Sequence, residues 1–583
     1  MPDQLRYDSV GFTGRNDIIR TPNLDRFAQM GTRFTNTFSQ ASVCSQSRCS
    51  IFTGQYPHVS GHRSLNNLLK PDEPNLLRTL KEHGGYHIGY LGPRGDLFAA
   101  NATEHSVDEY GYLENATLPD FASAPDFSAY VSARSDAPSS FNASNPPTVA
   151  DPDPDPDSIW NRVFYGGLRN ATAALDYDER MIRGALDWLE CPPQHKPWVL
   201  FLPLIFPHPP FEVEEPWFSM YNRSAIPLPA KAEEKTGHEA RFAQQIRDQY
   251  NTYRATDALW QEVKAVYYGM ISRVDDQFGR IMNKTIERGL WNNTVTLFFT
   301  DHGEFLGDWG LVEKWPSAVS ENLVHEPLII GGAGLPEGVV YEEMAEMVDL
   351  VPTMLQLGST GEFYAHYGLS LVDAMHAAGR NETLPHKQYA FTEGGFLTSE
   401  EPLLEQGPYP YDIKTALQHD DTELVGKAVS IRDQEFTYVY RLYEADELYL
   451  RDDTSELRNL AADPAFAGVR QRMRDVVMRW MVETADTLPW YQDVRVPQVR
   501  LQSPKEQFEE RVPESPVYTT FLAPLGRSHV LPGWNPLSSE IVGKCLLRLH
   551  VGVRIKTYGH VFSASCLKTP VDEKDNCPTA VGP

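Results

Sequence analysis

The sequence has no run of 18 or more apolar residues, so it predicts no membrane-spanning helix. Positive charge is also scarce, because 52 Lys and Arg stand against 79 Asp and Glu, for a formal net charge of −27 at pH 7. Phosphate contacts require clustered Lys and Arg, which argues against a nucleic-acid partner. Residues 1–11 lack the charged start and apolar core of a signal peptide. The mildly acidic composition is typical of a soluble folded protein.

Cysteine is rare, with six residues in 583, yet two of them stand five positions apart. Cys44 and Cys49 flank Arg48 in the polar segment VCSQSRCSIFTG, residues 43–54. Neither cysteine belongs to a C-x-x-C pair, which argues against a zinc site. The spacing alone leaves open a disulfide between them, burial as structural cysteines, or a reactive turn.

Helix-like and strand-like segments alternate through the first two thirds of the chain. Residues 21–31 predict a helix that begins after Thr21 and stops at Gly31. Short apolar runs typical of buried strands recur at 85–92, 198–205 and 294–301. We therefore predict an α/β fold in which a large, mostly parallel sheet is sandwiched by helices, with ligands bound beyond the carboxyl ends of its strands.

The composition changes along the chain and suggests domain boundaries. Residues 1–385 are predicted to form the α/β domain, with 116–158, rich in Ala, Ser, Asp and Pro, as an exposed insertion. Residues 386–500 contain closely spaced strand-like segments followed by a helical one, which predicts a smaller α+β domain with an antiparallel sheet. Residues 501–583 are predicted to be an irregular tail.

Polar residues with ligand or acid–base chemistry follow the predicted strands. Asp301 and His302 end the third apolar run, His208 follows the second, and Asp3 and Gln4 stand near the start. A hard divalent cation prefers oxygen ligands, which Asp3, Gln4 and Asp301 could supply. Taken singly, each residue fits an ordinary loop equally well, and His208 fits a turn held by backbone carbonyls.

Taken together, these segments are similar to one protein family. VCSQSRCSIFTGQYPH resembles the sulfatase signature, in which Cys or Ser, any residue, Pro or Ala, Ser and Arg precede a Thr-Gly. Segments that resemble the same family follow in the same order, namely PHPPF, TDHGEFLGDWGLVEK, EMVDLVPTMLQL and DELYLRDDTSELRNL. The resemblance covers about residues 3 to 490, so the chain is identified as a member of the sulfatase family, with an alkaline-phosphatase-like fold.

The resemblance implies a catalytic set. In sulfatases a formylglycine-generating enzyme oxidises the signature cysteine to an aldehyde whose hydrate is the nucleophile, and Cys44 matches that position. Arg48 matches the arginine that holds the modified residue. Lys314 matches the lysine that contacts sulfate oxygens, and His208 matches the histidine that lies near the leaving-group oxygen.

The resemblance also implies a metal site. Its positions match Asp3, Gln4, Asp301 and His302, most like family members that bind one Ca²⁺. The cation would lower the pKa of the aldehyde hydrate and neutralise sulfate oxygens.

Several positions depart from the family pattern. Gln46 replaces the usual Pro or Ala, which maturation enzymes read. The common GKWHLG segment is GPRGDLF here, so Arg94 would replace the lysine that binds substrate, with Asp96 in place of the histidine. His58 and His62, just past the signature, are candidates to line the substrate pocket.

The start of the chain departs most. Relatives begin with an apolar strand, roughly NILFIMTDQ, whereas this sequence begins MPDQ. We expect a strand of about five or six apolar residues to be encoded upstream, preceded by a signal peptide. Eight N-glycosylation sequons favour a secreted, secretory-pathway or lysosome-like location, although a cytoplasmic one stays open; they start at Asn101, Asn115, Asn142, Asn170, Asn222, Asn283, Asn292 and Asn381.

The leading hypothesis is a sulfuric ester hydrolase that cleaves a small-molecule or carbohydrate sulfate monoester through formylglycine made from Cys44. One alternative is a phosphonate monoester or phosphodiester hydrolase of the same superfamily. Another is a catalytically inactive, sulfatase-like glycoprotein, which the departures at Gln46 and at the start of the chain favour.

Overall fold

The computed structural model describes residues 1–92, 97–110, 155, 157–169 and 177–486. These residues all belong to one compact unit. Arg94, most of the predicted insertion 116–158 and the predicted tail 501–583 lie outside the described residues. The predicted domain boundaries stay predictions.

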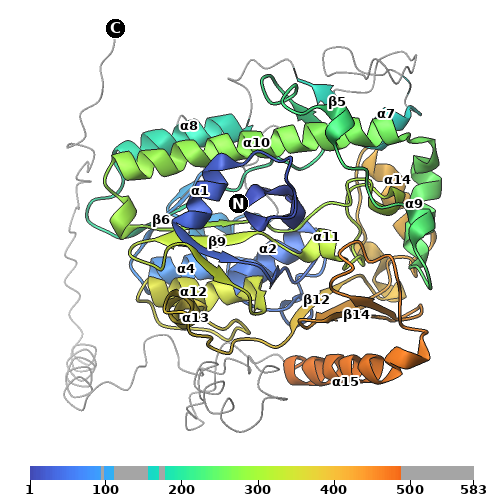
Figure 1. The fold of residues 1–583 in the computed structure, drawn as a ribbon. Coiled ribbons are helices and arrows are strands. Elements are labelled where there is room, and N and C mark those ends of the chain that lie inside the picture. Colours follow the sequence, from blue (N-terminus) through green and yellow to red (C-terminus); the bar gives the residue numbers. More distant parts are fainter. Residues whose placement is uncertain (93–96, 111–154, 156, 170–176, 487–583) are drawn as a thin grey trace, which may run out of the picture. The chain divides into compact units, whose positions relative to one another are not determined.

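The described helices and strands alternate along most of the chain (Figure 1). The helices are α1 Pro22–Gln29, α2 Cys44–Thr53, α3 Pro57–Ser60, α4 Leu76–Glu82, α5 Thr103–Ser106, α7 Ile159–Arg162, α8 Tyr177–Glu190, α9 Arg241–Tyr250, α10 Asp257–Glu287, α11 Glu321–Val324, α12 Leu350–Leu357, α13 Val372–Gly379, α14 Tyr411–Asp420 and α15 Ala467–Thr484. The strands are β1 Gly31–Phe34, β2 Thr37–Phe38, β3 His87–Tyr90, β4 Glu109–Tyr110, β5 Tyr165–Leu168, β6 Trp198–Phe201, β7 Phe211–Val213, β8 Val295–Phe299, β9 Leu328–Gly332, β10 Val339–Tyr341, β11 Ala345–Glu346, β12 Ala390–Gly394, β13 Ala428–Arg432, β14 Phe436–Arg441 and β15 Glu447–Leu450.

The first helix forms where the sequence predicts it, but tertiary contacts set its ends. Thr21 precedes α1, yet its hydroxyl accepts the backbone N–H of Gly11 at 2.8 Å and does not cap the helix. Asp275 of α10 takes that role, because its Oδ1 accepts the backbone N–H of Leu24 at 2.8 Å. Gly31 does not stop the helix but begins β1, since α1 ends two residues earlier.

Parallel strands dominate the α/β part, as predicted. The three apolar runs become β3, β6 and β8, and β3 pairs in parallel with both β4 and β6. A second sheet has the order β10-β1-β9-β8, in which β9 is antiparallel to both β1 and β8. In Figure 1, helices α1, α8 and α10 lie above strands β6 and β9, and α4, α12 and α13 lie below them. The sheet layer is therefore covered on both faces.

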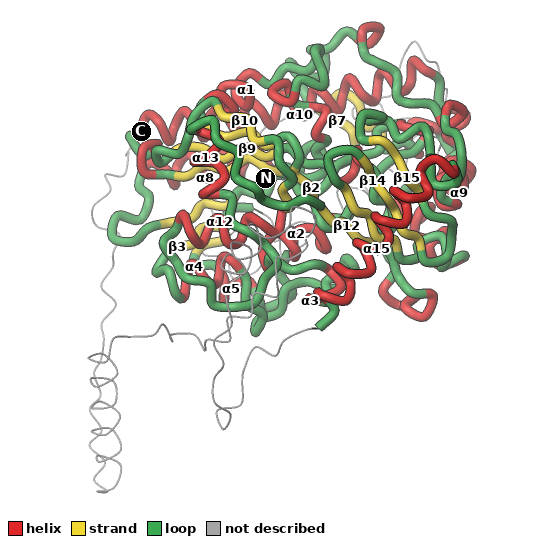
Figure 2. Tube along the Cα trace, turned by 60° about the horizontal axis from the view of Figure 1, so that its bottom comes forward, coloured by secondary structure: helices red, strands yellow, loops and turns green. Residues whose placement is uncertain are grey.

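The predicted antiparallel sheet is present toward the C-terminal end. Its strands have the order β12-β13-β14-β15, all antiparallel, and α15 packs against β13 and β14 (Figure 2). Phe391 of β12 stacks on Trp480 of α15 with ring centroids 4.6 Å apart. Helix α14 lies between β12 and β13 in the chain, an element that the sequence analysis did not predict.

Candidate active site

Cys44 is the first residue of α2 and is buried. Its Sγ lies 3.0 Å from Nε2 of His302 and 3.7 Å from Oδ1 of Asp3. Cys49 points elsewhere, toward the backbone oxygen of Leu97 at 3.9 Å, because five residues of helix separate the two thiols. No disulfide joins Cys44 to Cys49, so the Cys44–Cys49 disulfide that the spacing left open is not formed.

Arg48 joins the start of the chain to the end of β8. It lies one helical turn after Cys44, on the same face of α2. Its Nε donates to Oδ2 of Asp301 at 2.7 Å, and its Nη2 to Oδ2 of Asp3 at 2.6 Å. Burial disfavours the charged carboxylate of Asp301, but Arg48, together with His302 and the backbone N–H of Gln4, holds the pKa of that carboxyl well below its usual range. Asp301 is therefore a carboxylate at neutral pH.

Four side chains from three distant segments form a buried donor cluster. Donor atoms of Asp3, Cys44, Asp301 and His302 all lie within 4.8 Å of one another. Nδ1 of His302 lies 2.9 Å from the backbone oxygen of Gly303, a contact in which Nδ1–H donates and Nε2 faces the cluster as an acceptor. Burial lowers the pKa of His302 to about 4. Two carboxylates and a neutral imidazole at this spacing fit a divalent cation.

Gln4 links the donor cluster to a second group of charges. Its Oε1 accepts from Nζ of Lys314 at 2.7 Å, and the same ammonium lies 3.2 Å from Nε2 of His208 and 2.6 Å from Oε1 of Glu313. Nδ1 of His208 is 2.6 Å from the backbone oxygen of Pro209, a contact in which Nδ1–H donates, and Nε2 is the nitrogen that accepts from Lys314. Burial, and then the positive charge of Lys314, lowers the pKa of His208 to about 3. The proton between the two groups therefore resides on the ammonium of Lys314, which donates it in a hydrogen bond to the neutral imidazole.

Sequence reasoning missed the carboxylates that hold these groups. Glu304 accepts the backbone N–H of Glu313 at 2.6 Å and contacts the amide of Gln4. Burial, and then the charge of Glu313, raises the pKa of Glu304 to about 7. Oε2 of Glu313 also accepts from Lys414 at 2.7 Å. Both glutamates lie in the segment TDHGEFLGDWGLVEK and could have been noticed there, whereas nothing in the sequence connects Lys414 with it.

Tyr411, at the start of α14, was also missed. Its ring faces that of His208, with centroids 6.4 Å apart and planes 27° from parallel. Its hydroxyl is buried and has no hydrogen-bond partner in the described part of the chain. Burial, and then the negative charge of Glu313, raises the pKa of the phenol well above its ordinary value. Tyr411 therefore keeps its proton and can donate it in a hydrogen bond.

The structure gives His58 and His62 protein partners away from the donor cluster. Nδ1 of His58 is 2.6 Å from Oε1 of Glu393, and its Nε2 is 2.8 Å from Oγ1 of Thr484 in α15. Nδ1 of His62 is 2.7 Å from the backbone oxygen of Asn67. Substrate binding by either histidine stays a prediction, and these contacts favour a structural role. Arg94 cannot be placed, since it lies outside the described residues.

Replacing His58 by alanine is therefore expected to reduce stability and not catalysis. The change leaves the buried carboxylate of Glu393 without its imidazole partner, which we expect to cost about 2–4 kcal/mol in the free energy of unfolding. The catalytic constants should change by less than about threefold. Urea unfolding and steady-state kinetics measure the two effects, with His105→Ala, at an exposed position, as control. A large loss of kcat/KM at unchanged stability would instead place His58 in the substrate pocket.

Comparison with known proteins decides the family. A sequence model of the family described as Sulfatase matches residues 1–360, which is more than half of the chain. The chain belongs to the sulfatase family. Membership supports hydrolase activity and agrees with the α/β fold described above.

Relatives of this sulfatase-family chain span most of its length. It is 26% identical over 525 residues to the multifunctional alkaline phosphatase superfamily protein PehA of Trinickia caryophylli, covering 84% of this chain and 96% of that protein. It is 28% identical over 410 residues to an arylsulfatase of Clostridium perfringens, covering 67% and 81%. The solved phosphonate monoester hydrolase of Agrobacterium radiobacter shares the fold, with a TM-score of 0.63 and 21% identity over 86% of this chain and 98% of that one.

Proposed function

We propose that this sulfatase-family chain hydrolyses a sulfate monoester, with formylglycine made from Cys44 as nucleophile and one divalent cation, Ca²⁺ in the first instance. Asp3, Gln4, Asp301 and His302 would hold the cation. The observation that carries the proposal is the position of Cys44, at the N-terminus of α2, with its Sγ 3.0 Å from His302 inside the buried donor cluster. The positive end of the helix dipole favours an anionic substrate there.

Each side chain then has a defined task. The bound cation and the aldehyde hydrate would supply an acidified oxygen nucleophile. Arg48 helps to keep Asp301 ionised and fixes the orientation of both Asp3 and Asp301. Lys314 offers its ammonium to an anionic oxygen of the ester, and a proton that this ammonium gives up to Nε2 of His208 can be passed on to the departing alkoxide. Glu313 and Lys414 hold Lys314 in place.

Tyr411 is proposed to bind the substrate through its hydroxyl. Replacing it by phenylalanine removes one hydrogen-bond donor and keeps the ring beside His208, so we expect kcat/KM to fall about tenfold with little loss of stability. Steady-state kinetics and thermal unfolding test this. The matched control is Tyr341→Phe on β10, whose hydroxyl is also buried without a partner among the described residues. Equal kinetics for the two variants would remove Tyr411 from the substrate site.

The second candidate is a phosphonate monoester or phosphodiester hydrolase. What favours it is the likeness to PehA, described as multifunctional, over nearly the whole of that protein. Sulfate and phosphonate esters present similar anionic oxygens, and the ammonium of Lys314 would serve either. A third candidate, the inactive glycoprotein, is favoured by Gln46, which stands where the signature usually has Pro or Ala.

One experiment separates the three candidates. Aryl sulfate, aryl phosphonate and aryl phosphodiester substrates are assayed in parallel on the same preparation, and the tryptic peptide of residues 34–48, which contains Cys44, is analysed by mass spectrometry. Formylglycine in that peptide with a preference for sulfate supports the proposal. A preference for phosphorus of about a hundredfold in kcat/KM supports the second candidate. Unmodified cysteine in protein from the native source, with no turnover, supports the third.

We also propose that the chain passes through the secretory pathway. Five sequon asparagines fall within the described residues and all are exposed, namely Asn101, Asn222, Asn283, Asn292 and Asn381. Exposure is required for glycosylation. None of the described helices is long and apolar enough to cross a membrane. Treatment of native protein with an N-glycosidase should lower its apparent mass, and an unchanged mass would contradict the proposal.

A further inference from the structure

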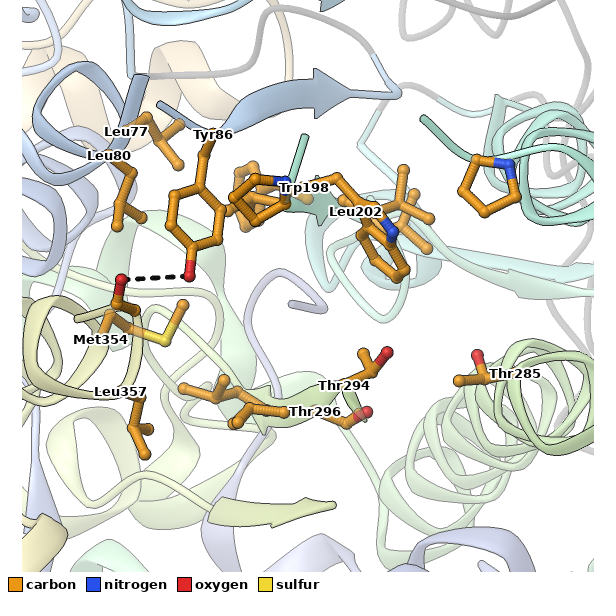
Figure 3. A pocket seen from close by; sticks show the side chains of 18 of the residues that line it. Leu77, Leu80, Tyr86, Trp198, Leu202, Thr285, Thr294, Thr296, Met354 and Leu357 are labelled. Carbon is orange, nitrogen blue, oxygen red and sulfur yellow. Dashed lines mark hydrogen bonds between the residues drawn. The ribbon is translucent and has the colours of Figure 1, made fainter. Parts of the chain in front are cut away.

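A cavity of about 830 Å³ in the described part of the chain has a mainly apolar lining. Figure 3 shows Leu77 and Leu80 of α4 and Leu357 of α12 on its walls. Among the described residues that line it, Lys196 is the one Lys, Arg, Asp or Glu, and it is exposed. Apolar walls do not offset the cost of removing an anion from water. The charged groups that can act on an anionic ester therefore lie elsewhere, around Lys314.

Helix α14 has polar side chains where a helix usually packs apolar ones. Tyr411, Lys414 and Gln418 are spaced three and four residues apart, so they lie on one face of the helix. Lys414 and Gln418 are buried, with exposed fractions of 5% and 0%. A lysine is almost never fully buried unless it is paired, so the partners of Lys414 indicate what this face of α14 does.

Four buried charged side chains alternate in sign from Lys314 to Glu405. Nζ of Lys314 lies 2.6 Å from Oε1 of Glu313, and Oε2 of Glu313 lies 2.7 Å from Nζ of Lys414. The ammonium of Lys414 also lies 3.1 Å from Oε2 of Glu405, which accepts from Nε2 of Gln418 at 2.8 Å. We call Lys314, Glu313, Lys414 and Glu405 the lysine–glutamate tetrad. Its two inner members, Glu313 and Lys414, each contact a charge of opposite sign on both sides.

The two inner members of the tetrad are held in their charged forms. Burial disfavours the carboxylate of Glu313, but the charges of Lys314 and then Lys414 contribute most to holding its pKa well below the usual range. Burial likewise disfavours the ammonium of Lys414, but Glu313 and then Glu405 hold its pKa above the ordinary value. Two ammonium groups and two carboxylates cancel, so the tetrad has no net charge.

Removal of the charge on Lys414 would leave the tetrad with one net negative charge. Glu313 lies 2.6 Å from the ammonium of Lys314, so its uncompensated charge would act directly beside that ammonium. Such a charge is poorly screened in a buried site and opposes the approach of an anion.

We propose that Lys414 is a positioning residue for ester hydrolysis, which cancels the charge of Glu313 and so leaves the ammonium of Lys314 able to attract an anionic oxygen of the substrate. This role rests on the proposed function in one respect, namely that Lys314 meets the ester. It applies equally to a sulfate ester and to a phosphonate ester, because both are anionic. Glu405 and Gln418 hold Lys414 in turn.

The test uses two variants that break the same ion pair and change the charge in opposite directions. Lys414→Met keeps an unbranched side chain and gives the tetrad a net charge of −1, whereas Glu405→Gln gives it +1. The double variant returns the net charge to zero. Binding of inorganic sulfate is measured by isothermal titration calorimetry in buffer that contains Ca²⁺, together with kcat/KM and Tm. Sulfate binding requires no turnover, so it can be measured whether or not Cys44 is modified.

The expected effects on the two variants have opposite signs. Lys414→Met should weaken sulfate binding and lower kcat/KM by about a hundredfold each. Glu405→Gln should bind sulfate more tightly, by about threefold or more. The double variant should return to within about tenfold of the unchanged protein in both quantities. Both single variants should lower Tm, because each leaves a buried charge with one partner fewer.

A merely structural role for Lys414 predicts a different pattern. Both single variants would then lose sulfate binding and activity in step with Tm, and the double variant would not recover; either result overturns the proposal. Unchanged sulfate binding and kcat/KM in Lys414→Met overturn it as well. If Lys414→Met does not fold, Glu405→Gln decides, because weaker sulfate binding by that variant contradicts the proposal and tighter binding supports it.

Failure of the proposed function gives a separate result. Unchanged protein that turns over none of the esters, while the variants keep the expected order of sulfate affinities, would contradict the proposed function and support the role of Lys414 in attracting an anion. Turnover by unchanged protein without that order would do the reverse.

Discussion

Replacement of Cys44 by alanine is expected to abolish turnover, with kcat falling by at least about 10³-fold. In the proposed mechanism the thiol of Cys44 is the precursor of the aldehyde, and it lies at the start of α2, where His302, Asp3 and Arg48 converge. Alanine is smaller than cysteine and keeps the helix, so the fold and the donor cluster should survive. Thermal unfolding, metal content and activity on the substrate found in the parallel assays are measured together.

Cys49→Ala is the matched control for this change. Cys49 is fully buried on another part of the same helix, and its Sγ faces backbone oxygens instead of the donor cluster. We expect it to lose about 1 kcal/mol in the free energy of unfolding and to keep most of its activity. If both cysteine variants were equally active, the nucleophile would be a different group and the assignment of Cys44 would fall.

Changing Asp301 to asparagine is expected to remove the bound metal. The substitution keeps the volume and deletes one of the two negative charges that face the proposed cation, so metal affinity should fall by at least about a hundredfold, and turnover with it. Elemental analysis of dialysed protein and a Ca²⁺ titration followed by Tm measure the loss. His302→Ala should have a milder effect, because water can replace one neutral ligand.

A structural penalty accompanies the loss of Asp301 and needs its own control. Arg48 would lose its ion pair with Asp301 and keep the one with Asp3, which weakens a buried charge network. Asp308→Asn also deletes a carboxylate from an ion pair, here 2.7 Å from Nη1 of Arg6, but adds no change to the donor cluster. It should lower Tm and keep the metal. Stoichiometric metal in Asp301→Asn would show that the ligand set is wrong.

The segments that carry local signals were predicted well. The helix predicted within residues 21–31 forms as α1 over Pro22–Gln29. The apolar run at 198–205 gives β6, which ends at Phe201 because Pro203 follows and cannot continue a ladder. The backbone hydrogen bonds of a helix are made within its own segment, and those of a strand are made along its edges. Residue composition and spacing are therefore sufficient to predict where these elements form.

Direction and pairing of strands were harder to predict. Nothing in the residues of β9, LIIGG, shows that this strand runs against both of its neighbours. A buried strand has the same apolar composition in either direction, since both of its faces pack against helices. The connection between elements and the way they pack decide the orientation.

For the candidate active site too, part could be predicted from the sequence and part depends on the tertiary structure. The sequence by itself determined the family and the chemical types available, namely a signature cysteine, two aspartates, a histidine and a lysine at recognisable positions, because each stands in a short motif. Only the tertiary structure decided which atoms meet, that Tyr411 and Lys414 of α14 face His208 and Glu313, and that His58 binds Glu393 instead. These pairs are separated by 101 to 335 residues, so their contacts depend on how the layers pack and leave no local periodicity in the sequence.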